Sequence, residues 1–283
     1  MAYSKHEQLT NIRYEETILS GEGNCFVPLE VWTPTINPNN ILYKTLFEPF
    51  NLEQYLYPRL PVDMGVFDIY NKFSVNVLRL PIKYPNSEYK IPKEIVSYQE
   101  LIEKVSIYEM NINPNWNKTF CHITIDNSFV KANTHHRFPG WHGDGLQGAK
   151  FKQKIYPEHS YIITTAPATE LCLQPFFIKH LDDAKYNMFT EFDKQAKQNN
   201  VYKTLPNHLY IFDPYIVHKT PEIKKDVDRT FVRITYTFSE LEHPKNTVNK
   251  MFEPYKYSDR IDIKTTLSMV DFKIPYELYG IRK

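Results

Sequence analysis

Residues 229–238 read Arg-Thr-Phe-Val-Arg-Ile-Thr-Tyr-Thr-Phe, and this stretch decides the fold class. Apolar side chains at Val232, Ile234 and Tyr236 alternate with mostly polar ones, a period of two that is typical of a half-buried strand. Many short strands, with helices before and among them, indicate a mainly β fold with flanking helices, and we expect a two-sheet jelly-roll barrel. The other expected strands are short, end at turn-prone residues and cover 121–125, 161–164, 171–173 and 209–212.

Two segments have helical character. Ser97 to Glu100 matches a capping box, so we expect a helix that starts after Ser97. Residues 182–200 carry apolar side chains at helical spacing, which predicts a helical insertion capped by Asp182 and Asp183.

No repeat or linker divides the 283 residues, so we expect one domain. Residues 1–118 are expected to form a helical and irregular extension that packs on the barrel. Residues 119–240 form the expected core barrel, and residues 241–283 form a C-terminal extension.

Charge and cysteine content exclude several classes of protein. The chain has 34 Lys and Arg against 33 Asp and Glu, so no global field favours nucleic acid or an anionic membrane. Its three cysteines lack a CxxC spacing, which argues against a disulfide framework and against a thiolate zinc site. Without a signal pattern or an apolar span of ~20 residues, we expect a cytoplasmic protein with no membrane contact.

The segment 135–148, His-His-Arg-Phe-Pro-Gly-Trp-His-Gly-Asp-Gly-Leu-Gln-Gly, holds four of the chain's eight glycines. This concentration indicates an unusual backbone path. His142 and Asp144 are two residues apart, so an extended backbone places both side chains on one face, where they can reach one metal ion. His180 and Asp182 have the same spacing, but Asp182 has a structural role as a helix cap. Such pairs also arise by chance, so the His-x-Asp spacing alone is weak evidence. A site with two histidines and one carboxylate needs a second, distant histidine.

That histidine is expected at His218, which lies at the end of a predicted strand. Two histidines and one carboxylate on one side of an octahedral ion leave three positions open, the arrangement of non-haem iron(II) oxygenases. Arg229 and Arg233 follow on the polar face of the next strand, about 13 Å apart. An arginine there offers a fixed fork of donors for a dicarboxylate.

With these residues in this order, the predicted core barrel resembles the iron(II)/2-oxoglutarate-dependent oxygenase superfamily. The spacing from His218 to Arg229 is similar to that of the phytanoyl-CoA hydroxylase and taurine dioxygenase groups. The resemblance implies a double-stranded β-helix that uses iron(II), 2-oxoglutarate and O2, with ascorbate as a reductant in vitro. It implies iron ligands at His142, Asp144 and His218, and it makes Arg229 the leading partner of the 2-oxoglutarate C5 carboxylate.

Two positions in this pattern carry further expectations. Arg233 is the alternative partner of the C5 carboxylate, or it holds the other carboxylate, the substrate or a structural acid. The related halogenases have a small residue in place of the carboxylate, so Asp144 favours hydroxylation or desaturation over halogenation.

Side chains that flank the motif are candidates for substrate binding: Arg137, Trp141 and Gln147. Arg137 would bind an anion, and Trp141 would offer a flat apolar wall. His135 and His136 are candidates for a supporting role, although a histidine on a strand is more often structural. Three lysines at 150, 152 and 154 form either a basic lip or a solvated face, and we favour the solvated face.

We expect the substrate to be a small molecule such as an amino acid, a nucleoside or a natural-product intermediate. The same chemistry on a protein or nucleic-acid group is the alternative, and an open basic groove would favour it. From another class, a metal-free jelly-roll binding module would leave the three proposed ligands apart. A cupin-type isomerase is a third candidate, but cupins usually carry a His-x-His pair with a nearby glutamate. The sequence leaves the oligomeric state open.

Overall fold

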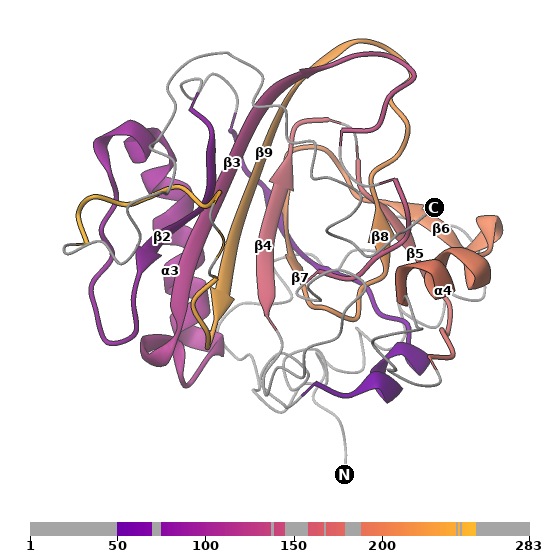
Figure 1. The fold of residues 1–283 in the computed structure, drawn as a ribbon, viewed down its shortest axis with the longest axis horizontal. Helices are drawn as coiled ribbons and strands as arrows, with labels where there is room; N and C mark the ends of the chain where they lie inside the picture. Colours follow the sequence, from indigo (N-terminus) through magenta and orange to yellow (C-terminus); the bar gives the residue numbers. More distant parts are fainter. Residues whose placement is uncertain are drawn as a thin grey trace.

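The structure is a computed structural model that describes residues 50–69, 75–136, 139–144, 158–166, 168–178, 188–241, 243 and 245–252. Two antiparallel sheets carry the fold (Figure 1). The major sheet has six strands in the order β1-β7-β4-β9-β3-β2, and the minor sheet has three in the order β6-β5-β8. This arrangement confirms a β-rich fold with few helices.

The strands of the major sheet are β1 (Val62–Val66), β2 (Val77–Lys83), β3 (Phe120–Val130), β4 (His159–Thr164), β7 (His208–Phe212) and β9 (Val227–Thr237). Those of the minor sheet are β5 (Glu170–Cys172), β6 (Val201–Lys203) and β8 (His218–Lys219). The α-helices are α3 (Gln99–Ile112) and α4 (Met188–Gln195). Short 3-10 helices are η2 (Leu52–Leu56), η3 (Lys93–Tyr98), η4 (Trp116–Lys118) and η5 (Gln198–Asn200).

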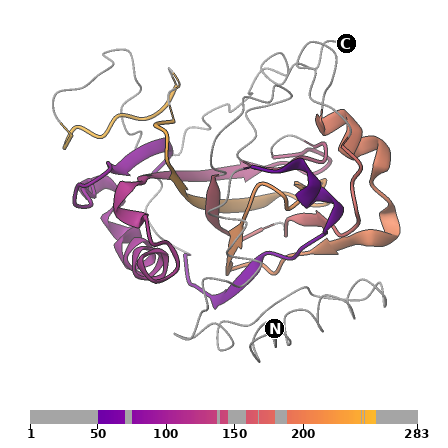
Figure 2. The same ribbon diagram turned by 90° about the horizontal axis from the view of Figure 1, so that it is seen from below.

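Strand β9 has the two faces that its alternation predicts. Val232, Ile234 and Tyr236 belong to the core cluster that also contains the buried apolar side chains of α3. Phe231 points to the other face, into a second cluster with residues of the minor sheet such as Leu171. Figures 1 and 2 show α3 at one side of the strands and the minor sheet with α4 at the other. The polar residues of β9 therefore face the space between the two sheets.

The major sheet extends further toward the N-terminus than the expected boundary at residue 119. Strands β1 and β2 form its two edges, so the segment 1–118 contributes strands as well as α3. Both strands pair with irregular register, β1 contains Gly65 at a φ of 86°, and β2 contains Pro81. Glycine and proline are typical of edge strands and bulges, and they interrupt the alternation that reveals a strand in sequence.

The expected helix after Ser97 is confirmed, but its expected capping box is wrong. Helix α3 has Tyr98 as its N-cap and no side-chain capping bond. The 3-10 helix η3 runs directly into α3, and its carbonyl at Val96 accepts from the Gln99 amide. Because the chain is already in a 3-10 helix where α3 begins, Ser97 lies inside a helical turn and cannot cap the N-terminus of α3.

The predicted insertion 182–200 contains α4, which begins at Met188; residues 181–187 lie outside the described part. After α4 the chain turns through η5 into β6 instead of remaining α-helical to residue 200. Residues 1–49 and 253–283, which belong to the two extensions, also lie outside the described residues. Among the helices that the structure describes, none has the length and apolar character needed to cross a bilayer.

Candidate metal centre

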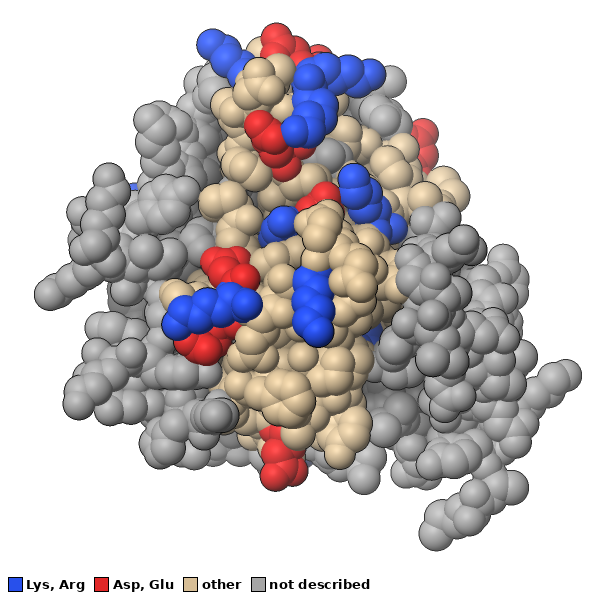
Figure 3. Space-filling view, turned by 90° about the vertical axis from the view of Figure 1, so that its right-hand side faces the viewer, with Lys and Arg blue, Asp and Glu red and all other residues tan. Residues whose placement is uncertain are grey.

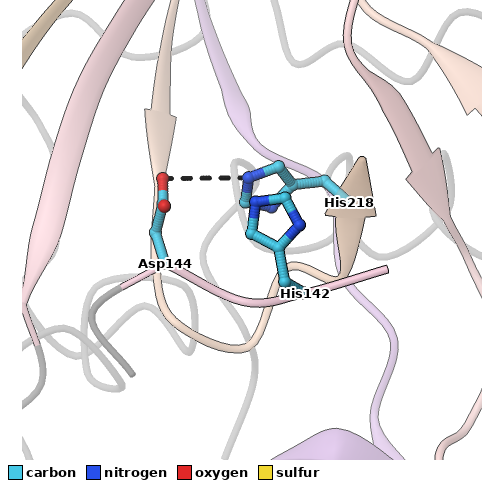
Figure 4. A group of neighbouring side chains, drawn as sticks. All are labelled: His142, Asp144 and His218. Atoms are coloured by element: carbon cyan, nitrogen blue, oxygen red, sulfur yellow. Dashed lines mark ion pairs between the residues drawn. The ribbon is translucent and has the colours of Figure 1, made fainter. Parts of the chain in front are cut away.

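The structure brings His142, Asp144 and His218 together (Figure 4). One ligand atom of each lies within 4.8 Å of the others. The backbones of the two histidines are paired directly: each amide donates to the carbonyl of the other, at 2.9 and 2.8 Å. This isolated bridge joins the segment before Asp144 to the start of β8, so the two imidazoles emerge side by side with ring centres 4.5 Å apart. The three ligands predicted from sequence therefore converge.

Both histidines are held in the tautomer that a metal requires. Nδ1 of His142 donates to the carbonyl of Gly140 at 2.8 Å, and Nδ1 of His218 donates to the carbonyl of Ile216 at 2.9 Å. A carbonyl oxygen can only accept, so each Nδ1 carries the proton and each Nε2 keeps its lone pair. Such a backbone partner also fixes the plane of the ring. Both Nε2 atoms are therefore prepared as ligands.

Burial keeps the His142 imidazole neutral. Burial, together with the neighbouring His218, lowers the pKa of His142 from 6.5 to about 4, against the opposing effect of Asp144. A neutral imidazole is the form that binds a metal, because a protonated ring has no lone pair to donate. At neutral pH, His142 thus needs no deprotonation before it can act as a ligand.

Asp144 is oriented by Arg233. Nη1 of Arg233 donates to Oδ1 of Asp144 at 3.0 Å, while Oδ2 lies 3.8 Å from Nε2 of His218. One carboxylate oxygen is therefore held by the guanidinium, and the other faces the imidazole nitrogens. In this arrangement Arg233 both fixes the carboxylate and compensates its charge.

Gly143, between the two ligands of the His-x-Asp pair, is required by close packing. A Cβ at this position would lie 2.3 Å from the carbonyl oxygen of Pro214 and 3.2 Å from the hydroxyl of Tyr55. That hydroxyl donates to the same carbonyl at 2.7 Å, which holds the Pro214 carbonyl in place. The absence of a side chain lets the segment of His142 approach the segment that leads to His218.

Of the two arginines, Arg229 lies further from the triad along the same face of β9. It is 5% exposed, and its Nη1 lies 3.0 Å from Nδ1 of His136. His136 thus has a supporting contact, whereas His135 is exposed and lies 3.3 Å from the backbone carbonyl of Thr220. Because Arg233 is engaged with Asp144, the two arginines have different surroundings.

Trp141, a predicted substrate contact, is largely buried among apolar side chains. It is 6% exposed and belongs to an aromatic cluster with Phe189 and Phe192. The ammonium of Lys219 lies 4.5 Å from the centre of its ring. Successive side chains of an extended segment point to opposite faces, so Trp141 lies on the face away from His142. The other expected substrate contacts, Arg137 and Gln147, lie outside the described residues, as do the three lysines at 150, 152 and 154 and the pair His180 and Asp182.

Two phenylalanines that the sequence did not single out contact the ligand rings. Phe189 of α4 meets His142 edge to face at 5.7 Å between ring centres, and Phe212 of β7 meets His218 in the same way at 5.2 Å. The strand pattern of 209–212 indicates that Phe212 is buried but not what it faces. Its contact depends on how the two sheets pack.

Comparisons with known proteins give distant structural similarities only. No protein-family model and no curated protein matches the chain. IDO from Bacillus thuringiensis is 11% identical, with a TM-score of 0.35, over 85% of this chain and 98% of that one. EvdO2 from Micromonospora carbonacea var. aurantiaca, complexed with 2-oxoglutarate, is 11% identical, with a TM-score of 0.31, over 57% and 76%. An oxidoreductase of the 2OG-Fe(II) oxygenase family from Burkholderia pseudomallei is 9% identical, with a TM-score of 0.27, over 62% and 73%. Because these values are low, the functional argument rests on the side chains of the centre.

Proposed function

We propose that the protein is an iron(II)- and 2-oxoglutarate-dependent oxygenase, a hydroxylase or desaturase built on a double-stranded β-helix. The observation that carries this proposal is the convergence of His142, Asp144 and His218 with both Nδ1 atoms bonded to backbone carbonyls. A metal-free binding module has no need to align three ligand atoms or to fix two tautomers.

The donor set fits iron(II). Two neutral imidazoles and one carboxylate form the facial arrangement that leaves open positions for further ligands. No cysteine of the described residues belongs to the centre: Cys121 and Cys172 are buried in different core clusters. Dioxygen would be the oxidant, and bound iron(II) with 2-oxoglutarate as the electron donor would activate it for the reaction.

The chain's own residues then bind and orient the reactants. Arg229, buried on the face of β9 that looks toward the minor sheet, is our choice for the distal carboxylate of 2-oxoglutarate. Arg233 is already bonded to Asp144, so its role is to hold that ligand. Phe189 and Phe212 pack against the ligand rings and shield them from water.

The surface favours a small-molecule substrate over nucleic acid. Figure 3 shows acidic and basic side chains interspersed on the face over the minor sheet. There Glu170 lies 3.5 Å from both Lys203 and Lys219, and Lys194 pairs with Glu191 at 2.8 Å. Nucleic-acid binding calls for a basic stripe, and the described part of this face carries mixed charge instead.

The proposal is tested by succinate formation from 2-oxoglutarate. Protein purified without oxygen would be given iron(II), ascorbate and air, beside the variants His142→Ala and His208→Ala. His208 is a matched control because it pairs with Asp63 of the edge strand β1 at 2.9 Å and is not one of the three ligands. We expect iron-dependent succinate that is lost in His142→Ala and kept in His208→Ala.

A second measurement covers slow turnover without the substrate. Iron(II) and 2-oxoglutarate, added without oxygen, should produce a visible absorption band that requires both. If the unchanged protein gives neither this band nor succinate, the oxygenase proposal is wrong and the binding module becomes the better explanation.

A further inference from the structure

His136 stands between an acid and the arginine that we assign to 2-oxoglutarate. Its Nδ1 lies 3.0 Å from Nη1 of Arg229. Its Nε2 lies 3.3 Å from Oδ2 of Asp126 and 2.5 Å from Oγ of Ser128. The side chains of His136 and Asp126 are 7% and 4% exposed, so the contacts form in a largely dry environment. An imidazole therefore connects β3 to the guanidinium on β9.

The contacts define which ring nitrogen carries the proton. Arg229 can only donate, so Nδ1 of His136 accepts and is unprotonated. Nε2 then carries the proton and donates toward the carboxylate of Asp126. The neutral imidazole thus has one partner of each kind, and both partners restrict its plane.

The backbone places this residue by folding the chain back over its own strand. Strand β3 ends at Val130, and the following turn is tied down by hydrogen bonds from Ala132 to Asp226 and from Asn133 to the carbonyl of Ile223. His136 then returns to Ser128, which is directly opposite Arg229 in the β3–β9 register. The same segment continues to His142, so one stretch of chain supports both the arginine and the metal ligands.

We propose that His136 is a positioning residue for the dicarboxylate co-substrate, acting through Arg229 and held by Asp126. This inference rests on the proposed function. An arginine side chain has many rotamers, and a ligand that must order it loses affinity. A fixed acceptor at Nη1 orders the guanidinium before the ligand arrives, so the remaining donors are already directed at the distal carboxylate.

The role predicts a specific pattern of ligand affinity. 2-Oxoglutarate has a distal carboxylate, whereas 2-oxovalerate has the same five-carbon chain without it. Loss of His136 should weaken 2-oxoglutarate binding by about tenfold, the effect of releasing one ordered side chain. It should leave 2-oxovalerate binding unchanged, because that ligand makes no use of Arg229. A purely structural role would affect both ligands alike.

Two amide variants separate the contacts of the imidazole. In His136→Asn, the amide oxygen takes the place of Nδ1 and can still accept from Arg229. In His136→Gln, the amide reaches the place of Nε2 and keeps the side toward Asp126 and Ser128. We expect His136→Asn to retain 2-oxoglutarate affinity within about threefold and His136→Gln to resemble His136→Ala.

The experiment measures binding without turnover. Each iron(II)-loaded variant is titrated with 2-oxoglutarate or 2-oxovalerate in the absence of oxygen, and binding is followed by the absorption of the iron chelate and by calorimetry. His208→Ala removes a comparable His–Asp pair of the same sheet and should change neither affinity. Iron affinity and melting temperature are recorded for every variant, so a loss of fold is recognised directly.

Either of two results overturns the inference alone. One is an unchanged 2-oxoglutarate affinity in His136→Ala, and the other is an equal loss for both ligands. If the unchanged protein binds iron but not 2-oxoglutarate, the proposed function is wrong and the inference fails with it.

Discussion

Substitution of Gly143 by alanine should disable the metal centre through a single methyl group. The new Cβ would lie 2.3 Å from the backbone oxygen of Pro214. Ordinary contacts between such atoms need about 1 Å more. Neither partner yields easily, because Tyr55 bonds to that oxygen and the His142–His218 bridge joins the same two segments. The segments must therefore separate.

The size of the effect follows from the tolerance of metal coordination. Ligand distances are held to within about 0.2 Å, so a separation of about 1 Å removes at least one ligand from reach. We expect metal affinity to fall about 100-fold or more, equivalent to about 2.7 kcal/mol. Overpacking should also lower the free energy of unfolding by about 1–3 kcal/mol.

A matched glycine separates the loss of metal from the loss of stability. Gly65 has a φ of 86°, and a Cβ there would meet no atom within 4 Å. Gly65→Ala should therefore destabilise by about 1–2 kcal/mol through backbone strain, yet leave the centre intact. Calorimetric titration with iron(II) or cobalt(II) without oxygen, together with thermal unfolding, measures both quantities. Metal affinity in Gly143→Ala equal to that in Gly65→Ala would refute the reasoning.

Three further predictions concern buried groups outside the centre. Lys83→Met should lower the free energy of unfolding by about 2–4 kcal/mol in denaturant titrations, because the buried ammonium of Lys83 donates to carbonyls that include those of Asn117 and Thr119. A loss below about 0.5 kcal/mol, the size of an ordinary surface change, would contradict this. Glu109→Gln should lower the free energy of unfolding by about 1–3 kcal/mol, since the carboxylate accepts from three side-chain donors and an amide would present its own hydrogens to them. The double variant with His159→Gln measures the coupling energy between Glu109 and His159. Burial raises the pKa of the Cys172 thiol to about 11 and raises the pKa of the Cys121 thiol further. Alkylation of both thiols should therefore be slow at pH 8 and rapid after unfolding, and only Cys172 should react faster as the pH approaches 11. Peptide mass spectrometry that shows prompt modification at pH 8 would contradict this prediction.

The features that could be predicted from sequence are those expressed over short distances along the chain. The alternation in β9 predicted both of its faces, and the spacing of two residues predicted that His142 and Asp144 share a side. His218 could be predicted as the third ligand because it lies at the end of a predicted strand, which can return the chain to the same site. The edge strands β1 and β2 were not recognised because Gly65, Pro81 and their irregular register weaken the alternating pattern.

Other features depend on packing between distant segments. The parity of an extended chain already places Trp141 and His142 on opposite faces, but it does not reveal what the indole packs against. No spacing rule reveals that Arg233 bonds Asp144 or that His136 reaches Arg229, because these contacts need the registers of β3 and β9 and the path of the loop after β3.

Because reciprocal amide hydrogen bonds join His142 and His218, metal binding and local opening of these two segments are thermodynamically linked. A bound ion would bridge the side chains of the same pair whose backbones are already joined, so neither segment could move away without releasing it. At an ion concentration 100 times the dissociation constant, this linkage would add about 2.7 kcal/mol against opening. The exchange of these two amide hydrogens with solvent would then slow in proportion to metal occupancy. Their exchange rate would therefore report the fraction of protein that has metal bound.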